Sequence, residues 1–348
     1  MRQADRRPAG LTLDEALAEI AAGAGDRDRA PAFPEGPMRL LERAGALAPG
    51  AGDDWELVRR VARADASVGR ILDGHRNGVD RLLALADPRL RAFESAALAA
   101  GARRIGVWGA DPAPGEGPPA RLSGEPAARR VHGVKVFCSG AGGVDRALVT
   151  VRGEAPAPLL AYVDVTRGVE VDRSWFGGSG LRASESHRVV FRGAAVVALL
   201  GGPGELAREP WFSLDAMRTA ASWVGMGEAA ADAALAALAA RGEPDDLAGR
   251  AAGRIAVAVE TMRACLDRAA GAARRRDDDL RAASVHLRAG VDGACREILD
   301  AARAAGSGAL VRGGPLDRCR RDLELFLLQH RLDPMVAALG RQDLARRR

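Results

Sequence analysis

Residues 131–153 read VHGVKVFCSGAGGVDRALVTVRG, and this stretch decides the fold class because regions of helical pattern lie on both sides of it. Its β-branched residues form two short runs around a glycine-rich turn, which is the pattern of paired strands. Runs of the same kind follow in LLAYVDV (159–165), GVEVDRSW (168–175) and HRVVFRGAAVV (187–197). We therefore expect a small antiparallel β-domain over residues 105–205.

The region before this domain, residues 1–104, has the apolar spacing of amphipathic helices. In LTLDEALAEIAAG, Thr12 and Glu15 have the spacing of a capping box, and Gly23 is a suitable helix end. After the β-domain the helical period returns in four segments with a strong apolar stripe, the last of them PLDRCRRDLELFLLQH (315–330), which predicts a four-helix bundle over residues 206–348. The expected fold class is therefore α+β, with the β-domain between two helical domains.

Composition excludes several function classes. The 348 residues are 47% hydrophobic and 28% charged, and the 51 basic side chains are interspersed with 46 acidic ones, so the net charge of +5 forms no stripe typical of nucleic-acid binding. The four cysteines show no metal-ligand spacing, and the three in helical segments are expected to be buried thiols. The cysteine spacing therefore predicts no metal site. Neither a signal peptide nor an uncharged apolar run of membrane-spanning length is present, which predicts a cytoplasmic protein.

Local motifs and their order give the chain a resemblance to a known family. HGVKVFCSGAGGVDRALVTVR (132–152) looks like a strand pair of the form N-G-x-K-x-W-I-T-N, and GGSGLRASESHRVVFRGAAV (177–196) looks like a G-x-R-x-S-x-T strand. AARAAGSGALVRGGPLDRCRRDL (301–323) is similar to a Gly-Gly turn followed by R-x-x-R-D. Together these segments resemble the acyl-CoA dehydrogenase superfamily, which has the same three-part architecture.

The resemblance implies an FAD cofactor and assigns it residues. Phe137 takes the place of the family's tryptophan at the flavin face, and Ser139 that of the hydroxyl residue near flavin N5. The loop that meets the isoalloxazine ring corresponds to Val107, Trp108, Gly109 and Ala110. The FAD pyrophosphate and adenosine contacts correspond to Arg241, Arg303, Gly306 and Ser307. Arg241 would act across a subunit interface, which implies a homodimer or homotetramer. From the residues alone, Phe137 is equally a core aromatic and Arg241 the polar end of a helix.

Other polar residues are candidates for contacting a small-molecule substrate. The resemblance places Arg182 and Ser184 beside the acyl-CoA channel, although both also suit an exposed strand. Glu116 stands where the family has a serine on the CoA side. Asp65 and His75 either face the pocket or belong to a helix start and a solvated polar face; the second interpretation is favoured.

The catalytic base is where the chain departs from the family. Many members have a Glu eight residues after the Arg-Asp pair, and counting from Asp322 gives His330 instead. His330 is itself a possible base, because a neutral imidazole has a suitable pKa, or it is a helix-end residue without chemistry. A second candidate is Asp215, which corresponds to the base position of a minority of members but is one methylene shorter than Glu.

These alternatives lead to three functional hypotheses. The first is α,β-oxidation of an acyl thioester with hydride transfer to flavin N5. The second is a two-component flavin monooxygenase on the same fold, because such enzymes carry phrases similar to FCSG (137–140) and a C-terminal H-x-x-D-P like HRLDP (330–334). The third is a non-catalytic member, since the connection GEPDDLAGRAAGR (242–254) lacks the family's Phe-Gly and Gln contacts.

Overall fold

Aspartate caps divide the N-terminal region of the computed structural model, which describes residues 11–50, 53–154, 156–275, 279–311, 313–328 and 332–348. The side chains of Asp53, Asp65 and Asp87 accept hydrogen bonds from the first backbone N–H groups of three helices, so a nearly continuous apolar pattern is split at these residues. The helices are α1 (Leu13–Ala22), α2 (Ala24–Arg29), α3 (Glu35–Arg43), α4 (Asp54–Ala64), α5 (Ala66–Leu85) and α6 (Pro88–Ala99). The predicted capping box of Thr12 and Glu15 is confirmed, as is the helix end at Gly23.

The β-domain is one seven-stranded sheet in the order β1-β4-β5-β7-β3-β2, with β6 paired to β7. Its strands are β1 (Ile105–Trp108), β2 (Arg121–Ser123), β3 (Arg130–Cys138), β4 (Arg146–Val151), β5 (Leu159–Asp164), β6 (Val169–Asp172) and β7 (His187–Leu200). The expectation of a purely antiparallel domain is wrong at one edge, because β1 pairs with β4 in parallel. Parallel strands need a long crossover connection, and the segment between β1 and β4, which contains β2 and β3, provides it.

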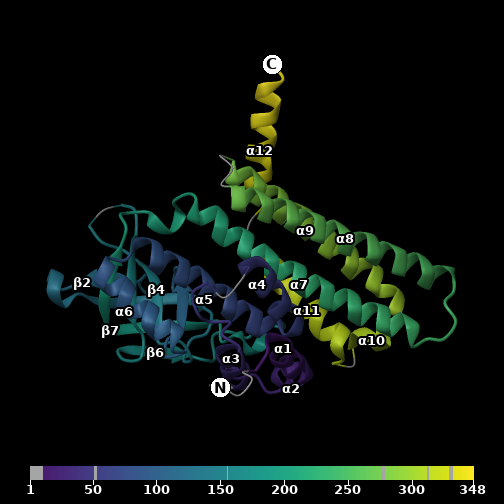
Figure 1. Cartoon of the computed structure of the whole chain (residues 1–348), viewed down its shortest axis with the longest axis horizontal. Coiled ribbons are helices and arrows are strands. Elements are labelled where there is room, and N and C mark those ends of the chain that lie inside the picture. The colour runs from purple at the N-terminus through teal and green to yellow at the C-terminus, as the bar shows by residue number, and fades with distance from the viewer. Residues whose placement is uncertain (1–10, 51–52, 155, 276–278, 312, 329–331) are drawn as a thin grey trace, which may run out of the picture.

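The C-terminal region contains the four helices that the sequence predicts, followed by a further helix (Figure 1). Its elements are α7 (Trp211–Ala239), α8 (Asp246–Arg275), α9 (Leu280–Ala301), the short α10 (Ser307–Val311), α11 (Pro315–Leu327) and α12 (Asp333–Arg346). The predicted last helix was too long, since α11 ends at Leu327. The chain then forms α12, a helix that the sequence pattern did not indicate and that projects from the body of the molecule.

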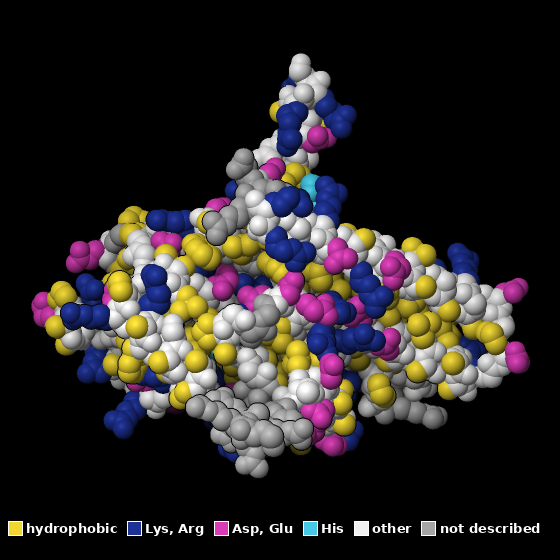
Figure 2. Space-filling view, viewed as in Figure 1, with side chains coloured by type: hydrophobic (Ala, Val, Ile, Leu, Met, Phe, Trp, Pro, Cys, Tyr) yellow, Lys and Arg dark blue, Asp and Glu magenta, His cyan; other side chains and the backbone are white. Residues whose placement is uncertain are grey.

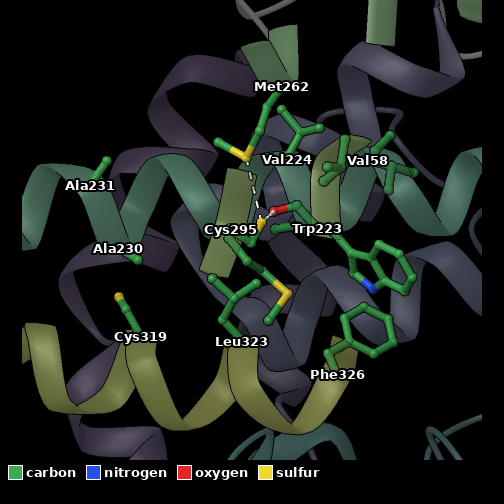
Figure 3. Close-up of a cluster of buried hydrophobic side chains, with 14 of the residues drawn as sticks. Val58, Trp223, Val224, Ala230, Ala231, Met262, Cys295, Cys319, Leu323 and Phe326 are labelled. Atoms are coloured by element: carbon green, nitrogen blue, oxygen red, sulfur yellow. Dashed lines mark hydrogen bonds between the residues drawn. The ribbon is translucent and has the colours of Figure 1, made fainter. Parts of the chain in front are cut away.

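The bundle core combines alanines with sulfur-containing, aliphatic and aromatic side chains (Figure 3). The Sγ of Cys295 lies 3.4 Å from the Sδ of Met262, and the Trp223 and Phe326 rings meet edge to face at 6.2 Å. Cys295 and Cys319 are buried free thiols as expected, whereas Cys265 is only partly buried. Because Phe326 also reaches the cavity described below, this core supports one wall of the candidate site.

The mixed architecture confirms the α+β fold class, with helix α5 packed against both β1 of the sheet and α7 of the bundle. Charges of both signs are interspersed on the face seen in Figure 2. In the part of the chain that the structure describes, we find no helix long and apolar enough to cross a membrane. The same residues contain no group of three His, Cys, Asp or Glu side chains placed to hold a metal ion.

Candidate functional site

A cavity of about 560 Å³ lies between the β-domain and helices α5, α7 and α11. Its described lining is mostly apolar and consists of Arg70, Gly74, Asn77, Val107, Gly109, Ala110, Phe137, Ser139, Phe176, Leu181, Ser186, Leu206, Phe212, Asp215, Ala216, Thr219, Leu325, Phe326 and Leu328. Gly74 is buried in α5, yet a Cβ added to it would meet no atom within 4 Å. The helix surface at Gly74 is therefore open to the cavity, which a larger side chain there would fill.

The β-domain wall of the cavity is a short loop that follows β1. Val107, Gly109 and Ala110 line the cavity, and the Val136 N–H on β3 donates to the Ala110 carbonyl at 3.1 Å. Behind the loop, Thr150 donates to the Gly109 carbonyl at 2.9 Å. The loop is thus fixed to two neighbouring strands, and its backbone forms part of the cavity surface.

Phe137 reaches the cavity because β3 is irregular at this point. The register of β3 against β7 shifts between Lys135 and Cys138, and Phe137 takes a left-handed backbone conformation with φ of 52°. Such a conformation is uncommon for a bulky residue and costs free energy. Phe137 is 56% exposed, and its ring meets the Trp175 ring edge to face at 4.8 Å. The bulge therefore presents an aromatic ring at the cavity rather than in the sheet core.

Three serine hydroxyls form a chain that leads from the interior to the cavity. Ser139 and Ser186 both line the cavity, and their Oγ atoms lie 2.8 Å apart. Ser186 is also 2.7 Å from the Oγ of Ser184, which is fully buried. The Asp322 carboxylate accepts the Leu181 N–H at 2.6 Å and so fixes the start of this turn. Two hydroxyl groups are thereby held at the cavity surface.

The helical wall carries the charged groups. Arg70 is paired with the buried Asp73 at 2.6 Å, and the Thr219 hydroxyl donates to the same carboxylate at 3.1 Å. Asp215 lines the cavity, and its Oδ2 accepts from Arg81 Nη2 at 2.7 Å and Nε at 3.2 Å. Burial raises the pKa of Asp215 to about 6, against the lowering effect of Arg81 and other nearby arginines. It is the one carboxylate among the described lining residues.

The structure brings some predicted residues together and separates others. Of the predicted flavin contacts, those that line the cavity are Val107, Gly109, Ala110, Phe137 and Ser139. Trp108 faces away, since it packs on Phe191 and its indole N–H donates to the Ser139 carbonyl at 3.0 Å. Arg182 donates to the Asp28 carbonyl at 2.7 Å and is not part of the lining, and neither is Ser184. His330 lies outside the described residues.

The predicted pyrophosphate and adenosine contacts lie at the other end of the bundle. Arg241 follows α7 and is about 33 Å along that helix from Thr219, at about 1.5 Å per residue. It is exposed and donates to the Ala304 carbonyl, close to Arg303, Gly306 and Ser307. Within one chain these residues do not reach the cavity, so a role for them requires a second subunit.

Asp65 and His75 are structural residues. Asp65 caps α5 and is paired with Arg27 at 2.8 Å. His75 lies 2.9 Å from the Leu47 carbonyl through Nε2 and accepts the Ile105 N–H at Nδ1. Burial lowers the pKa of His75 to about 4, so the ring is neutral at pH 7. The favoured interpretation as a helix start is correct for Asp65, but both side chains are buried rather than solvated.

Several lining residues were not predicted from the sequence. Arg70, Gly74 and Asn77 follow each other at spacings of four and three, which places them on one face of α5. Two polar side chains and a glycine on one helix face can be recognised in the sequence as a candidate site. Whether that face turns toward the cavity depends on how α5 packs on α7. Ser186 stands at the final position of the G-x-R-x-S-x-T-like match that begins at Gly180, so the motif could have identified it as a site residue.

Comparison with known proteins shows similarity in structure only. No family model matches the chain, and no curated protein sequence matches it either. Among solved structures, the complex of TdsC from Paenibacillus sp. A11-2 with FMN and indole superposes with a TM-score of 0.81 at 20% identity, covering 95% of this chain and 96% of that one. The methanesulfinate monooxygenase MsuC from Pseudomonas fluorescens gives 0.80 at 20% identity, with 95% of each chain covered.

A third structure extends the range of ligands. KijD3 in complex with FMN and dTDP-3-amino-2,3,6-trideoxy-4-keto-3-methyl-D-glucose has a TM-score of 0.80 at 24% identity, covering 98% of this chain and 95% of that one. Each of the three superpositions covers nearly the whole of both chains, so the shared feature is the complete architecture of helices, β-domain and bundle. The chain therefore has the acyl-CoA dehydrogenase fold, the architecture that its strand and helix motifs predict.

Proposed function

We propose that this protein is an FMN-dependent monooxygenase that receives reduced flavin from a separate reductase and oxygenates a small organic molecule. The observation that carries the proposal is the composition of the cavity. Its β-domain wall offers an exposed aromatic ring, loop backbone and two hydroxyl groups, whereas the described residues of its helical wall offer no carboxylate free of an ion pair.

The residues present fit the ring system of a flavin. Phe137 offers an apolar ring surface, the Gly109–Ala110 backbone offers polar groups along one edge, and the Ser139 and Ser186 hydroxyls offer hydrogen bonds. FMN fits the single chain better than FAD does, because Arg241 and Gly306 lie at the far end of the bundle. The FAD cofactor that the sequence motifs implied is therefore replaced by FMN in this proposal.

A dehydrogenase needs a carboxylate that is free to remove a carbon-bound proton. Asp215 is the single candidate among the described lining residues, and Arg81 donates twice to its Oδ2. Arg81 lowers the pKa of Asp215 against the larger raising effect of burial, and its two hydrogen bonds occupy Oδ2. This pairing favours oxygenation, which requires no α-proton abstraction.

Reduced FMN would supply two electrons and react with O₂, so that substrate, O₂ and reduced FMN give oxygenated substrate, oxidised FMN and water. The chain's own residues would orient the reactants and exclude bulk water. The apolar side chains Phe176, Leu206 and Phe326 enclose the reaction volume, and Ser139 and Ser186 hold hydroxyl groups at its β-domain side.

The test is oxygen incorporation under ¹⁸O₂. Purified protein is supplied with FMN and a flavin reductase and offered indole, an aryl sulfide and an amino sugar, and the products are analysed by mass spectrometry. One ¹⁸O atom in a product, dependent on both protein and reduced FMN, is the expected result. No ¹⁸O incorporation into any of the three compounds contradicts the proposal.

α,β-Oxidation of an acyl thioester is the second candidate, because Asp215 lies in the cavity with a pKa of about 6. A group with such a pKa near the working pH is suited to proton transfer. Anaerobic addition of acyl-CoA to the flavin-loaded protein distinguishes the two functions. Bleaching of the flavin absorbance supports the dehydrogenase, and unchanged absorbance supports the monooxygenase. A protein that binds neither FMN nor FAD would support the non-catalytic alternative.

A further inference from the structure

The chain's one lysine lies directly behind the loop that forms the β-domain wall of the cavity. Lys135 is 2% exposed, and its Nζ donates to the Gly109 carbonyl at 3.2 Å, to Asp111 Oδ1 at 2.8 Å and to Thr150 Oγ1 at 2.5 Å. Three acceptors require three N–H donors, which only the protonated amine supplies. The side chain is therefore a buried ammonium ion in contact with a residue that lines the cavity.

The charge behind the loop is not balanced within its own cluster. Among the residues that the structure describes, Asp111 is the one carboxylate that pairs with Lys135, and it also accepts from Arg152 at 3.3 Å. Two cations thus share one anion, which leaves an excess positive charge beside Gly109 and Ala110. Lys135 is buried, whereas Asp111 is 41% and Arg152 is 55% exposed, so solvent screens the latter two more strongly.

We propose that Lys135 is a positioning residue that makes the cavity select reduced over oxidised flavin. This inference rests on the proposed FMN function. Reduced flavin loses its N1 proton near neutral pH and then carries a negative charge on the ring, whereas the oxidised ring is neutral. A buried cation at the cavity wall lowers the free energy of the anionic ring and leaves that of the neutral ring nearly unchanged. The FMN phosphate is common to both states, so its contribution cancels in the ratio of the two affinities.

The experiment compares dissociation constants for reduced and oxidised FMN, measured anaerobically with the full chain. In Lys135→Met, which keeps the length and apolar stem, the ratio of reduced to oxidised Kd is expected to rise about tenfold. For a two-electron couple, tenfold corresponds to a shift of about 30 mV in the potential of the bound flavin. Equal weakening of both states, or no change in either, overturns the proposal, because a residue that only shapes the loop does not distinguish the two charges.

Two further variants test the sign and the role of burial. Asp111→Asn removes the negative charge and is expected to shift the ratio the opposite way, by about two- to fivefold. Arg152→Met is the matched control, since it removes a cation that contacts the same carboxylate from an exposed position, and a change below about twofold is expected. If Lys135→Met does not fold, the direction of the Asp111→Asn shift decides the question. Wild-type protein that binds FMN in neither state contradicts the proposed function rather than this inference.

Discussion

Arg81 and Asp215 form an ion pair that fixes three elements around the cavity. Arg81 on α5 donates to the Asp215 carboxylate on α7 at 2.7 Å and to the carbonyls of Glu205 and Leu206, in the turn before α7, at 2.8 and 2.9 Å. Arg81 is fully buried, so its charge depends on Asp215 for compensation. The ion pair therefore supports the cavity wall, and within it Arg81 occupies the Asp215 carboxylate that lines the cavity.

Removing one partner of this pair is expected to be costly. Arg81→Met leaves the Asp215 carboxylate buried without its main partner, and we expect the free energy of unfolding to fall by about 3–5 kcal/mol. Urea denaturation measures it. In the double variant with Asp215→Asn, no unpaired anion remains, so part of the loss is expected to be recovered. Purely additive losses would show that the two groups are not coupled.

Asp215→Asn alone separates the two candidate reactions. If the protein is a monooxygenase, Asp215 abstracts no proton, so the cost of leaving Arg81 without its anion falls on the free energy of unfolding, and turnover of the folded protein is expected to change by less than about tenfold. If Asp215 is a general base, its loss lowers the rate by about 10²–10⁴-fold. The measurement is initial rate with saturating reduced FMN, and Asp317→Asn, an acidic position on α11 that does not line the cavity, serves as the control.

Phe137→Gly is expected to reduce flavin affinity while leaving stability nearly unchanged. Glycine removes the cost of about 1–2 kcal/mol for a left-handed backbone at Phe137, and this offsets the lost contact with Trp175, which contributes about 0.5–1.5 kcal/mol. We expect the unfolding free energy to stay within about 1 kcal/mol of wild type and the FMN Kd to rise at least about tenfold. Phe137→Leu, which keeps the left-handed strain without an aromatic ring, separates the two effects. Unchanged FMN affinity in both variants would exclude Phe137 from the flavin contact.

Asp322 is expected to make the protein less stable as pH rises. Burial raises its pKa to about 7, above the usual value near 3.8, so the folded chain binds this proton more tightly than the unfolded chain does. Its contribution is fully present below pH 4 and is lost between about pH 4 and 7. Asp322→Asn keeps the acceptor for the Leu181 N–H and does not titrate.

At pH 8, Asp322→Asn should therefore be more stable than wild type by roughly 1–4 kcal/mol, since one pKa unit corresponds to about 1.4 kcal/mol. At pH 4 the two proteins should be nearly equal. Thermal or urea unfolding across this range measures the difference. Asp317→Asn is the control of opposite sign, because hydrogen bonds from Arg321 and Arg320 outweigh the effect of burial and hold the pKa of that carboxyl below its usual range. A pH-independent difference for Asp322→Asn would contradict this assignment.

The sequence predicts the fold well because periodicity and caps are local signals. The capping box at Thr12 follows from neighbouring residues. The two strands on either side of Gly140 were also predicted, but the expectation that they pair with each other is wrong, because β3 pairs with β7 and β4 pairs with β5. The parallel pairing of β1 with β4 was missed, because pairing between distant strands depends on how the chain crosses over. The helix α12 was missed because its pattern of Ala, Gly and Arg gives little amphipathic signal.

The site is less predictable because it depends on side-chain direction. Phe137 reaches the cavity only through the bulge after Lys135, which the alternation of a regular strand does not indicate. The pairing of Arg81 with Asp215 joins residues 134 positions apart and was not predicted. It changes the interpretation of Asp215 from a free base to half of an ion pair.

The central claim is that the cavity binds flavin, and a glycine-to-leucine comparison tests it most directly. Gly74 and Gly253 both lie within helices where an added Cβ meets no atom within 4 Å, but only Gly74 lines the cavity. Both substitutions should leave the fold intact, since leucine favours a helix more than glycine does. FMN binding is measured by titration of flavin fluorescence for wild type, Gly74→Leu and Gly253→Leu. The account predicts that Gly74→Leu abolishes or strongly weakens binding while Gly253→Leu matches wild type. Equal FMN affinity in all three proteins would contradict it.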